Sequence, residues 1–229
     1  MKRTKNGNPA GSDVYLVGSG IASLASAVYL IQDVGMPGSN IHILEQGKIA
    51  GGALDGTGDP EQGFVVRGGR MHEEHFTCYW DLLSRIGSLE DPEFSIRDES
   101  FDFSNRFVAN AGARLLRDGK ILDVSSFEVP VADQARMLKL MFSSERLLGK
   151  TRIEDWFSHE FFESNFWLIF TTMFAFQKWS SVVEMKRYME RFIHLVPGLE
   201  KLQGVMRTKY NQYHSVVLPI VDYLREQGV

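Results

Sequence analysis

Apolar and polar positions over residues 14–45 predict a strand, a helix and a second strand. A run of β-forming residues at 14–17 (VYLV) leads into the small residues GSG, and helix-spaced apolar positions follow over residues 21–34. The turn MPGSN ends that helix, and residues 41–44 (IHIL) predict a second strand that ends at Glu45. A single helix between two strands makes them parallel neighbours, so this stretch predicts a βαβ unit.

Residues 47–70 are rich in glycine and show little periodicity. They are expected to form an ordered system of loops that includes a short strand at residues 64–66 (FVV). The polar residues 1–12, which precede the first strand, are expected to form a flexible N-terminus.

The remainder of the chain is rich in aromatic residues and methionine and predicts mostly helix. Capping-box spacing at residues 151–154 predicts a helix start ahead of Trp156. The helices are expected at residues 71–86, 132–148, 165–176, 182–195 and 216–225. The predicted fold class is therefore α/β, a Rossmann-like βαβ unit with a largely helical region. We expect its sheet to be incomplete in this chain, because a βαβ unit alone cannot cover both faces of a parallel sheet.

The composition narrows the functional classes. The 229 residues are 44% hydrophobic and 24% charged, which excludes a disordered or fibrous protein. Lys and Arg total 25 against 29 Asp and Glu, so nucleic acid is not an expected partner. The single Cys78 excludes an internal disulfide, and the histidines lack metal-binding spacing, so no metal site is expected. The N-terminus is not a secretory signal and residues 166–176 are too short to span a bilayer, which predicts a soluble, cytoplasmic protein.

The turn between the first strand and the helix matches a dinucleotide-binding fingerprint. Gly18 allows a tight turn, and Gly20 lets the backbone approach a pyrophosphate at the positive helix N-terminus. Ser23 replaces the third glycine with another small residue. The residues expected to bind the cofactor here are Gly18, Ser19, Gly20, Ile21, Ala22 and Ser23.

A carboxylate and a second glycine stretch specify the nucleotide further. Glu45, followed by Gln46, ends the second strand, where a carboxylate binds ribose hydroxyls and repels the 2′-phosphate of NADP. Gly51, Gly52 and Ala53 favour FAD over NAD, because the longer nucleotide needs a second close approach of the backbone. We therefore interpret residues 13–70 as an FAD-binding region and residues 71–229 as a mainly helical substrate-binding region that ends in mid-domain, where LREQGV resembles the entry into a further strand.

Five blocks of the chain are distinctive: EQGKIAGGALDG (45–56), EQGFVVRGGRM (61–71), FAFQKWSS (174–181), RYMERFIH (187–194) and KYNQYHSVVLPIVDYL (209–224). In this order they resemble the N-terminal portion of the oleate hydratases, the FAD-dependent fatty acid hydratases also called myosin-cross-reactive antigens. The resemblance implies a lyase reaction in which water adds to the cis-9 double bond of oleic or a similar acid and gives a 10-hydroxy fatty acid. It implies no net redox change.

The resemblance also implies site residues. Arg67, Gly68, Gly69 and Arg70 would lie against the isoalloxazine ring, Tyr188 would donate a proton to the alkene, and Gln212 would hold the substrate. Met71 stands where most of the family has a water-activating glutamate. A helix that starts at Met71 would place Glu74 and His75 one turn along the same face as substitutes, or the reaction would need no base.

Partners and alternative functions stay open. The resemblance implies an unsaturated fatty acid as substrate, with contact to a membrane surface as one route of uptake and a C-terminal half or a homo-oligomer to complete the fold. One alternative is a catalytically incomplete fragment that binds only flavin or acyl chains. A second is an FAD-dependent oxidoreductase or isomerase of the amine-oxidase type. The Phe and Met side chains of residues 161–193 are expected to pack in a core or to line an acyl tunnel.

Overall fold

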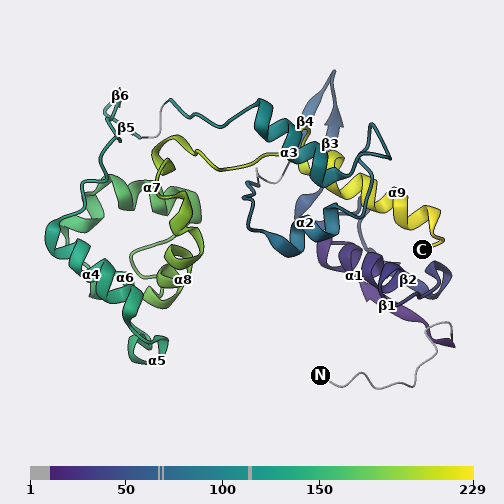
Figure 1. Cartoon of the computed structure of the whole chain (residues 1–229), viewed down its shortest axis with the longest axis horizontal. Helices are drawn as coiled ribbons and strands as arrows, with labels where there is room; N and C mark the ends of the chain where they lie inside the picture. The colour runs from purple at the N-terminus through teal and green to yellow at the C-terminus, as the bar shows by residue number, and fades with distance from the viewer. Residues whose placement is uncertain (1–10, 67, 69, 113–114) are drawn as a thin grey trace. The chain divides into compact units, whose positions relative to one another are not determined.

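The computed structural model describes residues 11–66, 68, 70–112 and 115–229, which form two compact units (Figure 1). The first unit holds the chain up to Val108 together with Met206–Val229, and the second holds Ala109–Val205. Residues 71–108 and the C-terminal segment therefore pack with the N-terminal part. The fold class is mixed α/β, with small sheets and many helices.

The first unit is built around a parallel βαβ arrangement, as the sequence predicts. Strand β1 (Val14–Val17) pairs in parallel with β2 (Ile41–Leu44), and α1 (Ile21–Gln32) connects them. Helix α1 ends two residues before the expected boundary at residue 34. It buries Leu24, Ala27 and Val28 and packs against α9 (Leu218–Glu226), the yellow helix in Figure 1. The core of this unit therefore joins the N-terminal and C-terminal segments.

The glycine-rich segment folds into an antiparallel hairpin. Strand β4 (Gly63–Val66) confirms the strand expected at residues 64–66, and it pairs with β3 (Gly56–Asp59), which the sequence did not predict. The β3 sequence, GTGD, contains two glycines and a single β-former, so its strand conformation comes from the partner strand rather than from local preference.

The expected helix over residues 71–86 is wrong at its start, because α2 (Thr77–Leu83) begins six residues later. Residue His72 instead pairs with Met206 through two backbone hydrogen bonds, at N···O distances of 3.0 and 2.8 Å. The Glu73 carboxylate accepts the backbone N–H of His75 at 2.7 Å, which holds this segment outside the helix. Helix α3 (Ile96–Arg106), which the sequence reading missed, follows with an N-terminal cap from Ser95.

The half-buried His72 ring stacks on Tyr79, with ring centroids 4.6 Å apart. Burial lowers the pKa of His72 to about 4 from an ordinary value of 6.5. The folded state therefore holds His72 as the neutral imidazole. The contribution of this group to the free energy of unfolding is complete above pH 6.5 and is lost as the pH falls towards 4. We expect this loss to be about 3 kcal/mol.

Urea unfolding at pH 7.5 and pH 4 checks this expectation. Replacing His72 with phenylalanine keeps a ring against Tyr79 and removes the titrating group, so the variant should lose less stability on acidification than the parent. His42→Phe, a replacement of a half-exposed histidine in the same unit, is the matched control and should behave like the parent. An equal loss in the parent and in His72→Phe would contradict the assignment.

The second unit is mainly helical, as expected, and Figure 1 shows α4, α6, α7 and α8 arranged around a common centre. The single helix expected at residues 132–148 is divided at Ser143 and Ser144, because the Ser144 hydroxyl caps a new helix by accepting the Leu147 N–H. The elements of this unit are β5 (Leu116–Arg117), β6 (Lys120–Ile121), α4 (Val131–Phe142), α5 (Glu145–Leu148), α6 (Ile153–Trp156), α7 (Asn165–Phe174) and α8 (Val182–Phe192).

Short turns complete the two units. Only half of the capping box expected at residues 151–154 forms, one residue later, where the Asp155 carboxylate accepts the backbone N–H of Arg152 at 3.3 Å at the start of α6. Single turns of 3₁₀ helix cover Gly38–Asn40, Gly52–Leu54, Glu160–Glu163, Ile193–Leu195 and Leu199–Lys201, and a π-helical turn covers Tyr213–Val217. Among the helices of the described residues, none has the length and apolar content that a membrane span requires.

The chain leaves the first unit for the second and later returns, and in each unit one hydrogen bond joins the outgoing segment to the returning segment. In the first unit the Ser104 hydroxyl donates to the backbone carbonyl of Arg207 at 3.3 Å. In the second unit the Ala111 N–H donates to the carbonyl of Lys201 at 2.9 Å. The outgoing and returning segments therefore lie close together on each unit.

Candidate functional site

The turn between β1 and α1 leaves the start of the helix open to an anion. Gly18 has a φ of +86°, a conformation that favours glycine, and its N–H donates to the Leu44 carbonyl at 2.7 Å. Gly20 caps α1 without a side-chain hydrogen bond, and the first turn contains no acidic residue. The amides of the first helical turn, at Ile21, Ala22 and Ser23, can therefore donate to a phosphate group.

The second glycine stretch lies directly against this turn. The Gly51 N–H donates to the Ser19 carbonyl at 2.9 Å, and Gly51 pairs with Gly20 in a parallel bridge. Gly51 and Gly52 have φ angles of +113° and +56°. A Cβ atom at Gly52 would lie 3.1 Å from the Cα atom of Gly20, so the two turns approach closely only without a side chain. Ala53, the last residue expected in this stretch, is exposed.

Glu45 places a charged carboxylate beside the paired turns. It accepts the Ser19 hydroxyl at 2.6 Å, the Ser19 N–H at 2.9 Å and the Gly47 N–H at 2.7 Å. These hydrogen bonds, the one from the Ser19 hydroxyl first, lower the pKa of Glu45 to about 2. Glu45 also lines a cavity of about 250 Å³ with Gly52 and Asp55. It is therefore an ionised acceptor next to the helix N-terminus, while Gln46 follows it as an exposed residue.

A larger pocket in the same unit brings several expected residues together. This pocket, which we call the Arg70 pocket, has a volume of about 410 Å³. Gln212 donates from Nε2 to the Arg70 carbonyl at 3.0 Å, which ties the segment after Met206 to the glycine-rich loop. The described residues that line it are Leu54, Asp55, Val66, Gly68, Arg70, Met71, Arg207, Thr208, Tyr210, Asn211, Gln212 and Tyr213. Of the other expected site residues, Arg67 and Gly69 lie outside the described residues.

The sequence reading missed several of these lining residues. Asp55 supplies a carboxylate to the pocket that Met71 lines, and it lies in the same GGALDG block as the second glycine stretch. Tyr210 is held from outside the pocket, because its hydroxyl and the Lys209 ammonium group both bond to Glu90. The hydrogen bonds from Lys209 and Tyr210 lower the pKa of Glu90, which favours its ionised form. The available sequence signals were the GGALDG block for Asp55 and the KYNQY block for Tyr210.

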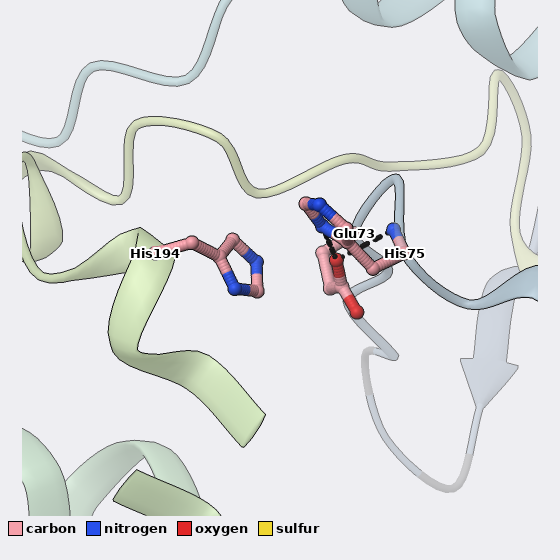
Figure 2. Close-up of side chains that lie close together, drawn as sticks. All are labelled: Glu73, His75 and His194. Carbon is pink, nitrogen blue, oxygen red and sulfur yellow. Dashed lines mark hydrogen bonds and ion pairs between the residues drawn. The ribbon is translucent and has the colours of Figure 1, made fainter. Parts of the chain in front are cut away.

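Glu74 and His75 do not follow Met71 on a helical face, so the spacing argument for them fails. Figure 2 shows His75 turned towards the buried Glu73, whose Oε2 lies 2.8 Å from the His75 Nδ1 atom. Glu74 and the half-exposed His75 are not among the described residues that line the Arg70 pocket. His194, also drawn in Figure 2, belongs to the second unit.

Tyr188 lies in the second unit, on the wall of an apolar cavity that we call the Tyr188 cavity. Its ring packs against Phe174 and Phe176 with centroids 5.1 Å apart, and the residue is 41% exposed. The cavity has a volume of about 540 Å³. It is lined by Ser126, Phe127, Glu128, Val129, Gln134, Met137, Leu138, Met141, Phe166, Phe170, Phe174, Tyr188, Met189, Phe192, Ile193, Val196 and Leu199.

The aromatic and methionine side chains of residues 161–193 divide between a buried core and the wall of the Tyr188 cavity. Phe161, Trp167 and Met185 are buried core residues. Phe174, Met189 and Phe192 line the Tyr188 cavity. The arrangement offers an apolar volume with one phenol on its wall, which suits a long hydrocarbon ligand.

Comparisons with known proteins agree with the sequence pattern. The chain is 43% identical over 226 residues to an oleate hydratase from Streptococcus pyogenes, covering 96% of this chain and 38% of that protein. It is 33% identical over 240 residues to a linoleate hydratase from Lactiplantibacillus plantarum, covering 95% of this chain and 42% of that protein. The chain thus spans about two fifths of the length of these relatives. The model of the MCRA family matches residues 11–229, and the chain belongs to this family.

Proposed function

We propose that this chain is the flavin-binding and acyl-binding part of a fatty acid hydratase, which adds water to the cis-9 double bond of oleate or a similar acid. The proposal rests chiefly on one observation, that Arg70, Met71 and Gln212 line a single pocket although they are far apart in the sequence. The two relatives, named as hydratases of oleate and linoleate, support a monounsaturated or polyunsaturated fatty acid as substrate. The product is a 10-hydroxy fatty acid.

The cofactor in this proposal is FAD, held by a Rossmann-like unit. The paired glycine turns fit it, since they leave the backbone of Gly20 and Gly52 without side chains beside an uncapped helix start. The α1 amides would hold the pyrophosphate, Glu45 the ribose, and Arg67–Met71 the flavin ring. When bound, FAD supplies a fixed polar surface and no net redox chemistry.

Tyr188 is the proposed proton donor. Its O–H gives a proton to one alkene carbon, and a water oxygen then bonds to the other carbon. An unperturbed phenol has a pKa of about 10, so this step needs a site that stabilises the charge developing in the transition state. The Tyr188 cavity would hold the hydrocarbon chain, and Gln212 would contribute a polar contact to the substrate.

Water activation is the least defined step, because Met71 cannot accept a proton. Glu74 and His75 remain candidates for the base, although they lack the helical alignment with Met71 that first suggested them. Capture of a cationic intermediate by water without a base is the other proposed course. In both courses one proton enters from the donor and one leaves the attacking water, so the sum is the addition of water.

Replacing Glu45 with glutamine tests the nucleotide site. The variant removes the charge that accepts ribose hydroxyls and weakens the anchor on Ser19, so FAD affinity should fall about tenfold, or about 1.4 kcal/mol. Equilibrium titration of flavin fluorescence gives the dissociation constant. Glu61→Gln, at the exposed tip of the β3–β4 hairpin, is the control and should bind FAD like the parent. Equal affinity in both variants would remove Glu45 from the site.

The function itself is tested by incubating the purified chain, and in parallel the full gene product that carries it, with FAD and oleic acid. The proposal expects bound flavin and a product heavier by one water. Bound flavin without product from the purified chain, together with product from the full gene product, would favour a catalytically incomplete fragment. Bleaching of the flavin by substrate under anaerobic conditions would indicate an oxidoreductase instead. A cytoplasmic location and completion by a C-terminal half or a homo-oligomer are further parts of the proposal.

A further inference from the structure

The Arg70 pocket contains a side chain that is suited to accept a proton. When water adds to an alkene, the attacking water must release one proton. Met71 lines the pocket, but its thioether is only a weak hydrogen-bond acceptor. Among the described residues that line the pocket, Asp55 alone carries a carboxylate, and neither Glu74 nor His75 is one of them. Asp55 is therefore the described group of this pocket that fits a proton acceptor.

The half-buried Asp55 borders two cavities of the first unit. One is the cavity of about 250 Å³ that Glu45 and Gly52 also line, and the other is the Arg70 pocket of about 410 Å³. The residue thus joins the proposed nucleotide site to the pocket that Met71 lines. A carboxylate at this border would be reached by water and by a ligand of the pocket.

The backbone around Asp55 is held on both sides. The Asp55 N–H donates to the Gly52 carbonyl at 3.2 Å, which closes the single turn of 3₁₀ helix before it. Gly56, the next residue, is buried, and a Cβ atom there would lie 3.1 Å from the Tyr213 Cβ atom and 3.6 Å from Asn211 Oδ1. Asp55 therefore lies in a fixed turn packed against the returning segment, which suits a group that must hold a reacting water in position.

The other polar groups of the pocket are unsuited to this role. Arg70 and Arg207 have no acceptor on their guanidinium groups. The hydrogen bond from the Tyr210 hydroxyl to Glu90 raises the pKa of Tyr210, so the phenol stays protonated at neutral pH. The Gln212 amide is neutral and donates to the Arg70 carbonyl. None of these side chains can take a proton from water as readily as a carboxylate.

We infer that Asp55 is the general base of the hydration reaction. As the water oxygen bonds to one alkene carbon, the Asp55 carboxylate takes the proton that this water releases. The other carbon takes its proton from Tyr188, and the two side chains then return to their starting states by exchange with solvent, so the sum is the addition of water. The inference rests on the proposed function for the reaction and deepens it, because it assigns the base to Asp55 in place of Glu74, His75 or no base.

Replacing Asp55 with asparagine in the full gene product tests this assignment. The side chain keeps its size and loses its charge, so kcat for oleate hydration at saturating FAD should fall about tenfold, while KM stays close to that of the parent. Flavin titration and thermal unfolding of the same variant should match the parent. Glu61→Gln, which removes a carboxylate from the exposed tip of the β3–β4 hairpin, is the matched control and should keep the parent kcat.

A second pair of variants moves the carboxylate within the pocket. Met71→Glu in the Asp55→Asn background brings a carboxylate back into the Arg70 pocket and should raise kcat at least about fivefold over Asp55→Asn alone. Met71→Gln in the same background has nearly the same size without the charge and should give no recovery.

The outcomes separate this inference from the proposed function. A parent kcat in Asp55→Asn at saturating FAD would overturn the inference, and so would equal rates in the two double variants. A loss confined to FAD affinity would overturn it as well and would make Asp55 a ligand of the nucleotide. A parent without hydration activity would contradict the proposed function itself, and the assignment of a base would fall with it.

Discussion

Replacing Tyr188 with phenylalanine is expected to lower kcat for oleate hydration by the full gene product at least tenfold. The phenylalanine ring keeps the packing against Phe174, Phe176 and Phe192, and only the O–H is lost. A positioned proton donor contributes about 10²–10⁴ to a rate, so the loss should appear in kcat, while KM should stay close to that of the parent.

The measurement is the initial rate of hydroxy acid formation over a range of oleate concentrations. Tyr15→Phe is the matched control, because Tyr15 is an exposed strand residue of the first unit that lines none of the cavities described above. An unchanged kcat in Tyr188→Phe would remove the phenol from the mechanism. A raised KM with an unchanged kcat would indicate that Tyr188 only lines the cavity and contributes to substrate binding.

Replacing Gly52 with valine is expected to weaken FAD binding at least a hundredfold, or about 2.7 kcal/mol. A β-branched residue is strained at a φ of +56°, and its Cβ would press on the Cα atom of Gly20 from 3.1 Å. The two turns must then separate, and the close approach of their backbones, which would hold the nucleotide, is lost. Equilibrium flavin titration measures the change.

Two further variants distinguish a local loss of the FAD site from a general loss of folding. A Cβ atom at Gly20 would contact nothing within 4 Å, so Gly20→Ala should fold normally. It should nevertheless weaken FAD binding about tenfold, because the methyl group stands where a phosphate would approach. Gly112→Val, in the second unit, meets open space and should bind FAD like the parent. Parent-like affinity in Gly20→Ala and Gly52→Val together would contradict binding at this turn.

The sequence predicted the βαβ arrangement almost residue by residue because its determinants are local. Strand β1, the glycine turn and α1 each follow from short-range periodicity and from the conformational freedom of Gly18. A contact between the two glycine stretches could also be expected from the sequence, since both follow the ends of adjacent parallel strands.

Contacts between residues far apart in the sequence could not be predicted. Apolar spacing from Phe76 to Ile86 suggested a helix that starts at residue 71, yet the backbone of His72 pairs with Met206, which no local pattern reveals. The same pairing directs residues 207–213 towards the Arg70 pocket, so local periodicity could not place Tyr210 there, and only its position in the KYNQY block pointed to it. Helix α3 was missed for a different reason. Its polar composition hides the periodicity, although Ser95, Asp98 and Glu99 form a good helix start.

The second unit is a continuous insertion into the first, because the first unit holds both the chain up to Val108 and Met206–Val229. Ser104 and Arg207 are hydrogen-bonded in the first unit, and Ala111 and Lys201 in the second. Closing the first unit with a short linker, or the second with its own ends joined, would cost little loop entropy. Each unit could therefore be cut out, exchanged or circularly permuted without opening the core of the other.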